Sequence, residues 1–380
     1  MTGQAVVCAI DVGSTFIKAT LRANVDNVLA RSSVPYPHDA AYGSAHDRVW
    51  SAFACAIREV CANQAPDAII LSCQMAGLSM IDDAGEPLGP LIPGVTVRAP
   101  RTGMIDVRRS GCGDVRASGV AKLLWLTETA RGLSLRSAQI GGIKEFLLYR
   151  LCGEWVTDRA SASSSGFYDI AGQHWSDDTL ELTGVTEHQL PRIAELDAVV
   201  GEILPAAAET CGVPVGTRVF CGLGDGPAAN ISSEAVGPQT MCLSRGTTVV
   251  VRVLFSGPAP DLGSLPIFTQ HVQGWWKCVG VRLTVASDGL FEPPGDPVPH
   301  YPVLRFRADQ VGAYLQPILD TFGVSDVRPV GGRAIPLPEH WPIHEVPADA
   351  QDGTRGMAMI ASGWQLATAA VRQPAKSVSS

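Results

Sequence analysis

The feature that most constrains this chain is a short pattern that occurs once in each half of the sequence. Residues 11–21 read Asp-Val-Gly-Ser-Thr-Phe-Ile-Lys-Ala-Thr-Leu, and residues 244–254 read Ser-Arg-Gly-Thr-Thr-Val-Val-Val-Arg-Val-Leu. The flanking β-branched residues predict two hairpins, each with a glycine-bearing turn at Gly13 or Gly246. Glycine lets backbone N–H groups point outward, so two such turns facing one cleft would hold a polyphosphate. The alternative is two unrelated hairpins.

The composition predicts a folded protein of about two domains. The chain has 380 residues, of which 46% are hydrophobic and 17% are charged, which excludes wholesale disorder. Its net charge of −8 disfavours a nucleic acid or an anionic membrane as partner. We find no basic leader and no apolar stretch of the roughly 20 residues that span a membrane. Ten scattered cysteines without a C-x-x-C pair favour a reducing, cytoplasmic setting.

Hydrophobic periodicity predicts the order of the elements. Before residue 217 it predicts strands at 5–10, 16–21, 28–34 and 68–72, and helices at 47–62, 121–130 and 143–151. A second start gives a strand at 218–221, a tight turn at 222–226, a helix at 227–236 and a hairpin at 241–255. We therefore expect two domains, residues 1–217 and 218–367, followed by a frayed tail at 368–380.

Taken in order, these segments resemble those of the FGGY carbohydrate kinases, within the sugar kinase, Hsp70 and actin superfamily. The resemblance is carried by six segments in order. They are the first phosphate motif at 11–18, a segment similar to the xylulokinase and gluconokinase branch at 73–88, the family's segment late in the first lobe at 140–158, the catalytic-aspartate turn at 222–230, the second phosphate motif at 243–248 and the adenosine motif at 327–332. It implies an α/β fold of two ribonuclease-H-like lobes around an ATP cleft, with the second lobe truncated.

The resemblance also implies a reaction, the ATP-dependent phosphorylation of a hydroxyl on a ketose, sugar acid, polyol or cyclitol. Asp225 is then the general base and Asp11 the Mg²⁺ ligand, roles that carboxylates can fill. Phosphate and nucleotide contacts are expected from Gly13, Ser14, Thr15, Lys18, Gly246, Thr247, Thr248, Gly331 and Gly332, and acceptor contacts from Gln74, Met75 and Arg101. The alternatives are a turn-forming Asp11, an Asp225 that caps the next helix, and a solvated Lys18.

The acceptor region departs from the family pattern. Val97 and Ala99 stand where the family's W-x-D-x-R stretch has Trp and Asp, and Ala76 replaces a histidine. The pocket therefore lacks polar contacts that usually set substrate choice, which argues against xylulose itself. The serine run at 161–165 is expected to be a polar loop facing the cleft, as in relatives.

The second half also departs from the family pattern. The segment 289–313 is short and Pro-rich, and the prolines at 335–342 exclude the helix that normally flanks the adenine, before a final helix resumes near 352–361. These changes motivate an alternative, a catalytically weak kinase fold with a ligand-binding or regulatory role. An actin- or Hsp70-like ATPase ranks last, since it would lack the segments at 73–88 and 140–158. A homodimer stays open.

Overall fold

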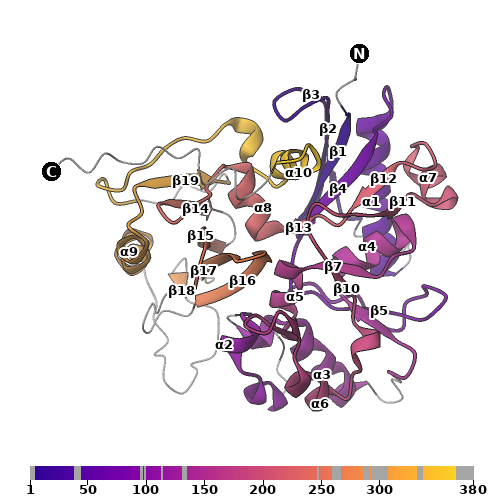
Figure 1. Ribbon diagram of the computed structural model, residues 1–380, viewed down its shortest axis with the longest axis horizontal. Helices are drawn as coiled ribbons and strands as arrows, with labels where there is room; N and C mark the ends of the chain where they lie inside the picture. Colours follow the sequence, from indigo (N-terminus) through magenta and orange to yellow (C-terminus); the bar gives the residue numbers. More distant parts are fainter. Residues whose placement is uncertain are drawn as a thin grey trace.

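The computed structural model describes most of the chain in two lobes (Figure 1). The described residues are 5–37, 44–94, 97, 100–112, 114–130, 135–245, 248–258, 267–285, 291–292, 307–331 and 337–364. Each lobe is built on a mixed β-sheet, which confirms the expected α/β fold with two lobes. Among the described helices, none has the length and apolarity needed to cross a bilayer.

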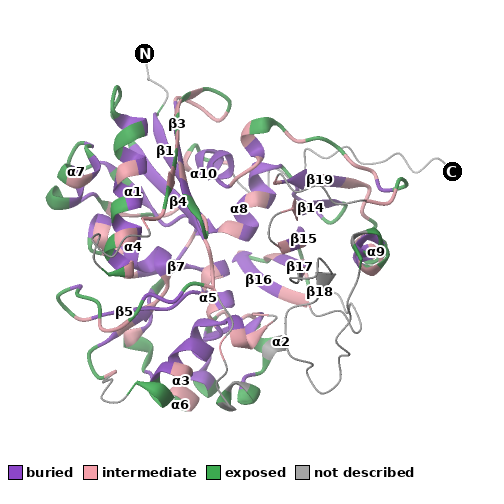
Figure 2. Ribbon diagram, turned by 180° about the vertical axis from the view of Figure 1, so that it is seen from behind, coloured by how far each residue is buried: buried purple, intermediate pink, exposed green. Residues whose placement is uncertain are grey.

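The first sheet has the strand order β11-β12-β4-β1-β2-β3, with β13 also paired to β4. Its strands are β1 (Val7–Val12), β2 (Phe16–Arg22), β3 (Val28–Pro35), β4 (Ala68–Cys73), β11 (Val199–Glu202), β12 (Arg218–Phe220) and β13 (Leu223–Gly224). β4 runs parallel to β1, and β1 and β2 form an antiparallel hairpin. β4 is buried along its whole length, because helices cover both faces of the sheet (Figure 2), as its mainly apolar sequence predicts.

Helices from distant parts of the chain cover this sheet. One face packs against α1 (Ala45–Cys61), α4 (Ile143–Cys152) and α7 (Pro205–Cys211). The other face packs against α8 (Asp225–Ser232) and α10 (Thr354–Ala361), which lie between the two sheets (Figure 1). α10 comes from the last described part of the chain. The packing of the first lobe therefore depends on residues that follow the second sheet in the sequence.

The second sheet repeats the arrangement of the first. Its order is β16-β17-β15-β14-β19, with β18 paired to β17, and its strands are β14 (Thr240–Arg245), β15 (Thr248–Ser256), β16 (Ile267–Gln273), β17 (Trp276–Val285), β18 (Phe291–Glu292) and β19 (Asp326–Val330). The hairpin β14–β15 has a parallel neighbour, β19, as β1–β2 has β4. α9 (Val311–Phe322) covers the outer face. The two sequence hairpins are thus equivalent parts of the two lobes.

The part of the chain that follows α1 and precedes the second lobe in the sequence forms a subdomain with its own apolar core. It is built from short strand pairs and helices, namely β5 (Ser79–Ile81) with β6 (Gln139–Gly141), β8 (Tyr168–Asp169) with β9 (His174–Trp175), α2 (Val107–Ser110), α3 (Gly119–Thr129) and α6 (Asp177–Thr183). A further strand pair, β7 (Val156–Asp158) with β10 (Arg192–Ala194), lies next to α5 (Arg159–Ser165). α5 packs against β16 of the second lobe.

Two local expectations differ from the structure. The serine run at 161–165 is helical, as part of α5, and the expectation of a loop is wrong, because Asp158 caps the helix by accepting the N–H groups of Ala160 and Ser161. The strand expected to open the second domain is β12, which pairs with β4 in the first sheet. The chain leaves the first sheet only after Gly224, seven residues beyond the expected boundary at 217.

Candidate active site

Three neighbouring strands, β1, β4 and β13, end side by side. β1 and β13 both run parallel to β4, and Asp11 and Leu223 are both register partners of Ser72. β13 leads directly into α8, whose N-cap is Gly224 and whose first residue is Asp225. Asp11 and Asp225 therefore lie on opposite sides of the carboxyl end of β4. The alternative in which Asp225 caps the helix is wrong, since Gly224 holds that position.

The Asp11 carboxylate is half-buried in an acidic environment. It accepts a hydrogen bond of 2.6 Å from Ser72 Oγ. Burial raises the pKa of Asp11 to about 7, and the charges of Asp352 and Asp225 add to the rise, against the opposing effect of Lys18. A carboxylate in this setting gains from any cation that neutralises it.

The Gly13 turn is held in place by side chains. The Gly13 N–H donates to the Phe16 carbonyl at 3.1 Å, and the Gly13 carbonyl accepts from Tyr36 Oη at 2.7 Å and from Gln74 Nε2 at 3.1 Å. The hydroxyl residues that follow Gly13, at positions 14 and 15, are both exposed. Gln74, expected to contact the acceptor, therefore also supports the phosphate turn.

The Asp225 carboxylate is half-buried, and the charges of two arginines act on it. Burial raises its pKa above the ordinary value, while Arg252, the Gly226 N–H and Arg282 act in the opposite direction. Met75 packs against the same turn, because a Cβ on Gly224 would lie only 2.2 Å from Met75 Sδ. A base that is more basic than an exposed aspartate, yet held near cations, suits proton abstraction from an alcohol.

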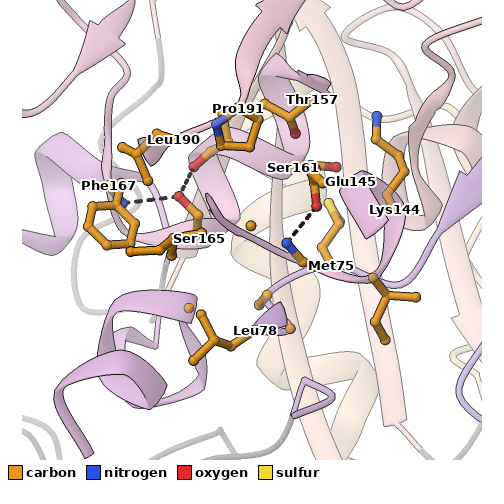
Figure 3. A pocket seen from close by; sticks show the side chains of 18 of the residues that line it. Met75, Leu78, Lys144, Glu145, Thr157, Ser161, Ser165, Phe167, Leu190 and Pro191 are labelled. Atoms are coloured by element: carbon orange, nitrogen blue, oxygen red, sulfur yellow. Dashed lines mark hydrogen bonds between the residues drawn. The ribbon is translucent and has the colours of Figure 1, made fainter. Parts of the chain in front are cut away.

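A small cavity of about 40 Å³ lies behind Gln74 and Met75. Figure 3 shows its mainly apolar wall, with Met75, Leu78, Phe167 and Leu190 turned toward it and Ser161 and Ser165 among the few polar groups. Ala76, also on this wall, has φ of +63°, a backbone conformation that costs an alanine free energy.

The second phosphate turn is described only in part. Thr248 begins β15, and Gly331 follows β19, where its carbonyl accepts from Arg245 Nη2 at 3.2 Å and its N–H donates to Gln351 Oε1 at 2.8 Å. β14, which ends at Arg245, and β19 are adjacent and parallel, so Gly331 lies next to the end of β14. Gly246, Thr247 and Gly332 lie outside the described residues, as do Ala99 and the tail at 368–380.

Lys18 and Arg101 lie in different settings. Lys18 Nζ is 3.7 Å from Asp352 Oδ2, and its side chain is 44% exposed. Arg101, on a 3₁₀ helix at Pro100–Met104, is exposed, and its guanidinium donates to the Leu182 carbonyl. Lys18 therefore belongs to the charged group around Asp11, whereas Arg101 is not among the residues that line the cavity behind Met75.

Sequence reasoning missed three charged residues near Asp11 and Asp225. Asp352 precedes α10, and Gly353 packs so closely that a Cβ there would lie 3.0 Å from Asp11 Oδ1. Arg252 is 6% exposed and donates from Nε to Asn230 Oδ1 at 3.2 Å. Arg252 and Arg282 each interrupt an apolar strand, in Val-Val-Val-Arg-Val-Leu and Val-Gly-Val-Arg-Leu, and these interruptions were the available signal.

The donor set suits a magnesium nucleotide better than a metal held by protein alone. Within the described parts of the chain, no three His, Cys, Asp or Glu side chains gather closely enough to hold a metal ion. Magnesium usually takes one or two carboxylates and completes its shell with water and phosphate oxygens. The carboxylates of Asp11 and Asp352 fit that role, since each raises the affinity of the site for a cation.

Comparison with known proteins shows that the chain is similar to carbohydrate kinases. The sequence model of the FGGY family of carbohydrate kinases, N-terminal domain, matches residues 6–232. The gluconokinase of Bacillus subtilis (strain 168) is 23% identical over 268 residues, which cover 66% of this chain and 52% of the relative. The L-fuculokinase of Escherichia coli (strain K12) is 27% identical over 271 residues, with coverages of 66% and 57%.

The fold is also similar to that of solved structures. The crystal structure of xylulose kinase from Rhodospirillum rubrum aligns with a TM-score of 0.78 at 18% identity, covering 96% of this chain and 92% of that chain. At that identity the likeness concerns the fold alone. The chain spans about half the length of the curated relatives that it matches.

Proposed function

The chain belongs to the FGGY family of carbohydrate kinases, and we propose that it transfers the γ-phosphoryl group of ATP to a hydroxyl of a small carbohydrate-like acceptor. The observation that carries this proposal is the position of Asp11 and Asp225 on either side of the carboxyl end of β4. One carboxylate is then available for the metal nucleotide and the other for the acceptor hydroxyl.

Asp225 acts as the general base in this proposal. The acceptor hydroxyl attacks the γ-phosphorus, the bond to the β–γ bridging oxygen breaks, and the hydroxyl proton passes to Asp225. Burial makes this carboxylate a better proton acceptor than an exposed aspartate. Arg252 and Arg282 favour its charged form before the transfer, so that it enters the reaction as a base.

The two turns hold the phosphates. The Gly13 turn, fixed by Tyr36 and Gln74, presents backbone N–H groups and the hydroxyls of Ser14 and Thr15. Gly246, Thr247 and Thr248 would act from the opposite lobe, with Lys18 near the phosphate charge and Gly331 and Gly332 at the adenosine. Phosphoryl transfer depends on such positioning and charge neutralisation more than on covalent chemistry.

Magnesium would be held by Asp11, directly or through water, with Asp352 close by. When bound, it would neutralise the charge that develops on the phosphate oxygens. The positive charge of Lys18 offsets part of the negative charge of the ionised carboxylates, so the site can hold a cation together with a phosphate group. Closure of the two lobes would exclude water, since an open site would lose ATP to hydrolysis.

The test is ADP release measured by a coupled assay with a panel of ketoses, sugar acids, polyols and cyclitols. Asp225→Asn should lower turnover at least about a thousandfold, in the range of losing a general base together with its charge. Calorimetry should find ATP affinity changed by less than about threefold. Asp178→Asn, on an aspartate whose side chain is 80% exposed on α6, is the matched control and should retain full activity. Full turnover by Asp225→Asn would remove this residue from the mechanism.

Nothing in the comparisons favours the alternative of a kinase fold without catalysis. The acceptor, a role for Arg101 in binding it, a homodimer and a cytoplasmic location stay predictions. ATP bound without turnover of any acceptor in the panel would restore the non-catalytic alternative.

A further inference from the structure

The inner face of the second sheet carries two arginines on neighbouring strands. Arg252 on β15 is opposite Gly280 on β17, and Arg282 on β17 is opposite Val250 on β15. Residues two apart on one strand share a face of the sheet, and so do residues opposite each other on neighbouring strands. Arg252 therefore shares a face with Val250, and Val250 with Arg282, so both arginines are on the face that meets α8. Their charges both reach Asp225.

Gly280 gives Arg252 the room it needs. A Cβ on Gly280 would lie 3.0 Å from Arg252 Cγ and 2.6 Å from Phe268 Cζ. Only the Cγ of Arg252 lies beside Gly280, and the guanidinium runs from there toward β14, where Nη2 donates to Ser244 Oγ. This packing, together with the hydrogen bond to Asn230, fixes the guanidinium beside α8.

A third side chain completes the group. Gln270 on β16 is 6% exposed and donates from Nε2 to Ser164 Oγ on α5 at 3.0 Å. A Cβ on Gly226, the residue after Asp225, would have Met75 Cε at 3.3 Å, Arg252 Cδ at 3.5 Å and Gln270 Oε1 at 3.7 Å. These three side chains thus converge on the turn that carries the proposed base.

Two polar atoms of this group are buried without a hydrogen-bond partner, Arg282 Nε and Gln270 Oε1. An unpaired buried donor and an unpaired buried acceptor each cost free energy unless a ligand satisfies them. A donor on a cation suits an oxyanion, and a neutral amide oxygen suits a hydroxyl. The required ligand therefore carries both a negative group and hydroxyls.

We propose that Arg252, Arg282 and Gln270 form the acceptor subsite and select a sugar acid, whose carboxylate pairs with the arginines while a hydroxyl donates to Gln270. This inference rests on the proposed kinase function and narrows its substrate class. The γ-phosphate is the other oxyanion that could pair with the arginines. We favour the acceptor, because Arg252 and Gln270 meet Met75 beside Asp225, whereas the Gly13 turn lies on the other side of β4.

The test compares matched acid and alcohol ligands by calorimetry, without turnover. The ligands are gluconate, galactonate and xylonate, each paired with the alditol of the same carbon skeleton, and a non-hydrolysable ATP analogue. Arg282→Met removes the charge while keeping length, Arg282→Lys restores charge, and Gln270→Glu adds an opposing charge. Arg192→Met, on an arginine 59% exposed on β10, is the control. Melting temperatures confirm that each variant folds.

At least one acid should bind more than about tenfold more tightly than its alditol. Arg282→Met should weaken that acid about ten- to a hundredfold, the range of a charged hydrogen bond, while leaving the alditol and the ATP analogue unchanged. Arg282→Lys should recover part of the loss, and Gln270→Glu should abolish the preference for the acid.

Two binding results would overturn the inference. One is that no acid binds better than its alditol, and the other is that Arg282→Met weakens the ATP analogue and not the acid. The proposed kinase function is judged separately by ADP release. Phosphorylation of alditols alone would refute the subsite and leave the kinase, whereas tight acid binding without ADP release would support the subsite and refute the kinase.

Discussion

The buried ion pair of Lys144 and Asp158 gives the sharpest test of how the first lobe is held together. Lys144 is 2% exposed and Asp158 is fully buried, and the ammonium also donates to the Cys221 carbonyl at 3.2 Å. Asp158 in turn caps α5, accepting from Ala160 N at 2.8 Å and Ser161 N at 3.1 Å. The pair thus joins α4, the cap of α5 and the strand region before α8.

Asp158→Asn isolates the charge, because asparagine retains an oxygen that can cap α5. It leaves the Lys144 ammonium buried with a carbonyl as its main partner, which should cost about 3–5 kcal/mol of unfolding free energy. Thermal unfolding should then begin roughly 10 °C lower. Lys144→Met with Asp158→Asn removes both charges and should recover most of the loss, since replacing both members of a buried pair is often nearly neutral.

The assay is denaturant and thermal unfolding of wild type, both single variants and the double variant. We expect a coupling energy of about 2 kcal/mol or more from the double-mutant cycle. A loss below about 1 kcal/mol for Asp158→Asn, or a double variant as unstable as the two single losses combined, would refute the reasoning.

The pH dependence gives a second reading of the same pair. Burial alone would raise the pKa of Asp158, but Lys144 and the hydrogen bonds from Ser161 outweigh it and hold that pKa below its ordinary value. Because folding lowers the pKa of Asp158, its ionised form stabilises the protein fully above the pKa of the unfolded chain, near 4. This stabilisation is lost as the pH falls through the pKa of the folded protein. The advantage of wild type over Asp158→Asn should therefore shrink only below about pH 4.

Three further predictions concern the cleft. Burial raises the pKa of Asp11 to about 7, so the ionisation of Asp11 costs the folded protein more stability as the pH rises from 4 to 7. Without metal or nucleotide, the melting temperature of Asp11→Asn should therefore rise relative to that of wild type across this range. A difference in melting temperature that does not change with pH would contradict this. Tyr36→Phe removes a donor to Gly13 and should weaken ATP binding about two- to tenfold by calorimetry; unchanged affinity would show that this bond does not support the turn. Gly222 has φ of +69°, and a Cβ there would lie 2.0 Å from a backbone oxygen of β4, so Gly222→Ala should lower the free energy of unfolding by more than about 3 kcal/mol in denaturant. The control is Gly103→Ala, whose added Cβ would have no atom within 4 Å. Equal losses for the two variants would contradict the strain argument.

The local elements were largely predictable. The strands of β1–β2 and β14–β15 follow from runs of β-branched residues, and the turns between them follow from glycine and hydroxyl residues. The expected helices at 47–62 and 143–151 correspond to α1 and α4, whose bounds differ by only one or two residues. Each of these predictions depends on side chains within a few turns of one another.

Roles that depend on distant partners were not predictable. Gln74 follows a buried strand, and no local pattern shows that its amide holds the Gly13 carbonyl. The serines at 161–165 have weak helix propensity, yet the cap from Asp158, anchored by Lys144, makes them helical. The sequence around Arg252 does not show that its guanidinium contacts Asn230 on α8, because the two residues are far apart along the chain.

The amino-acid sequence alone determined the repeated hairpins, the order of the motifs and hence the family, because strand periodicity and turn chemistry are short-range properties. Only the tertiary structure decided which charges lie near one another. Asp11, Asp225, Asp352 and the two arginines come from distant parts of the chain, and strand register together with the packing of α8 and α10 brings them together. Their pKa values and partners follow from the burial and neighbouring charges that this packing creates.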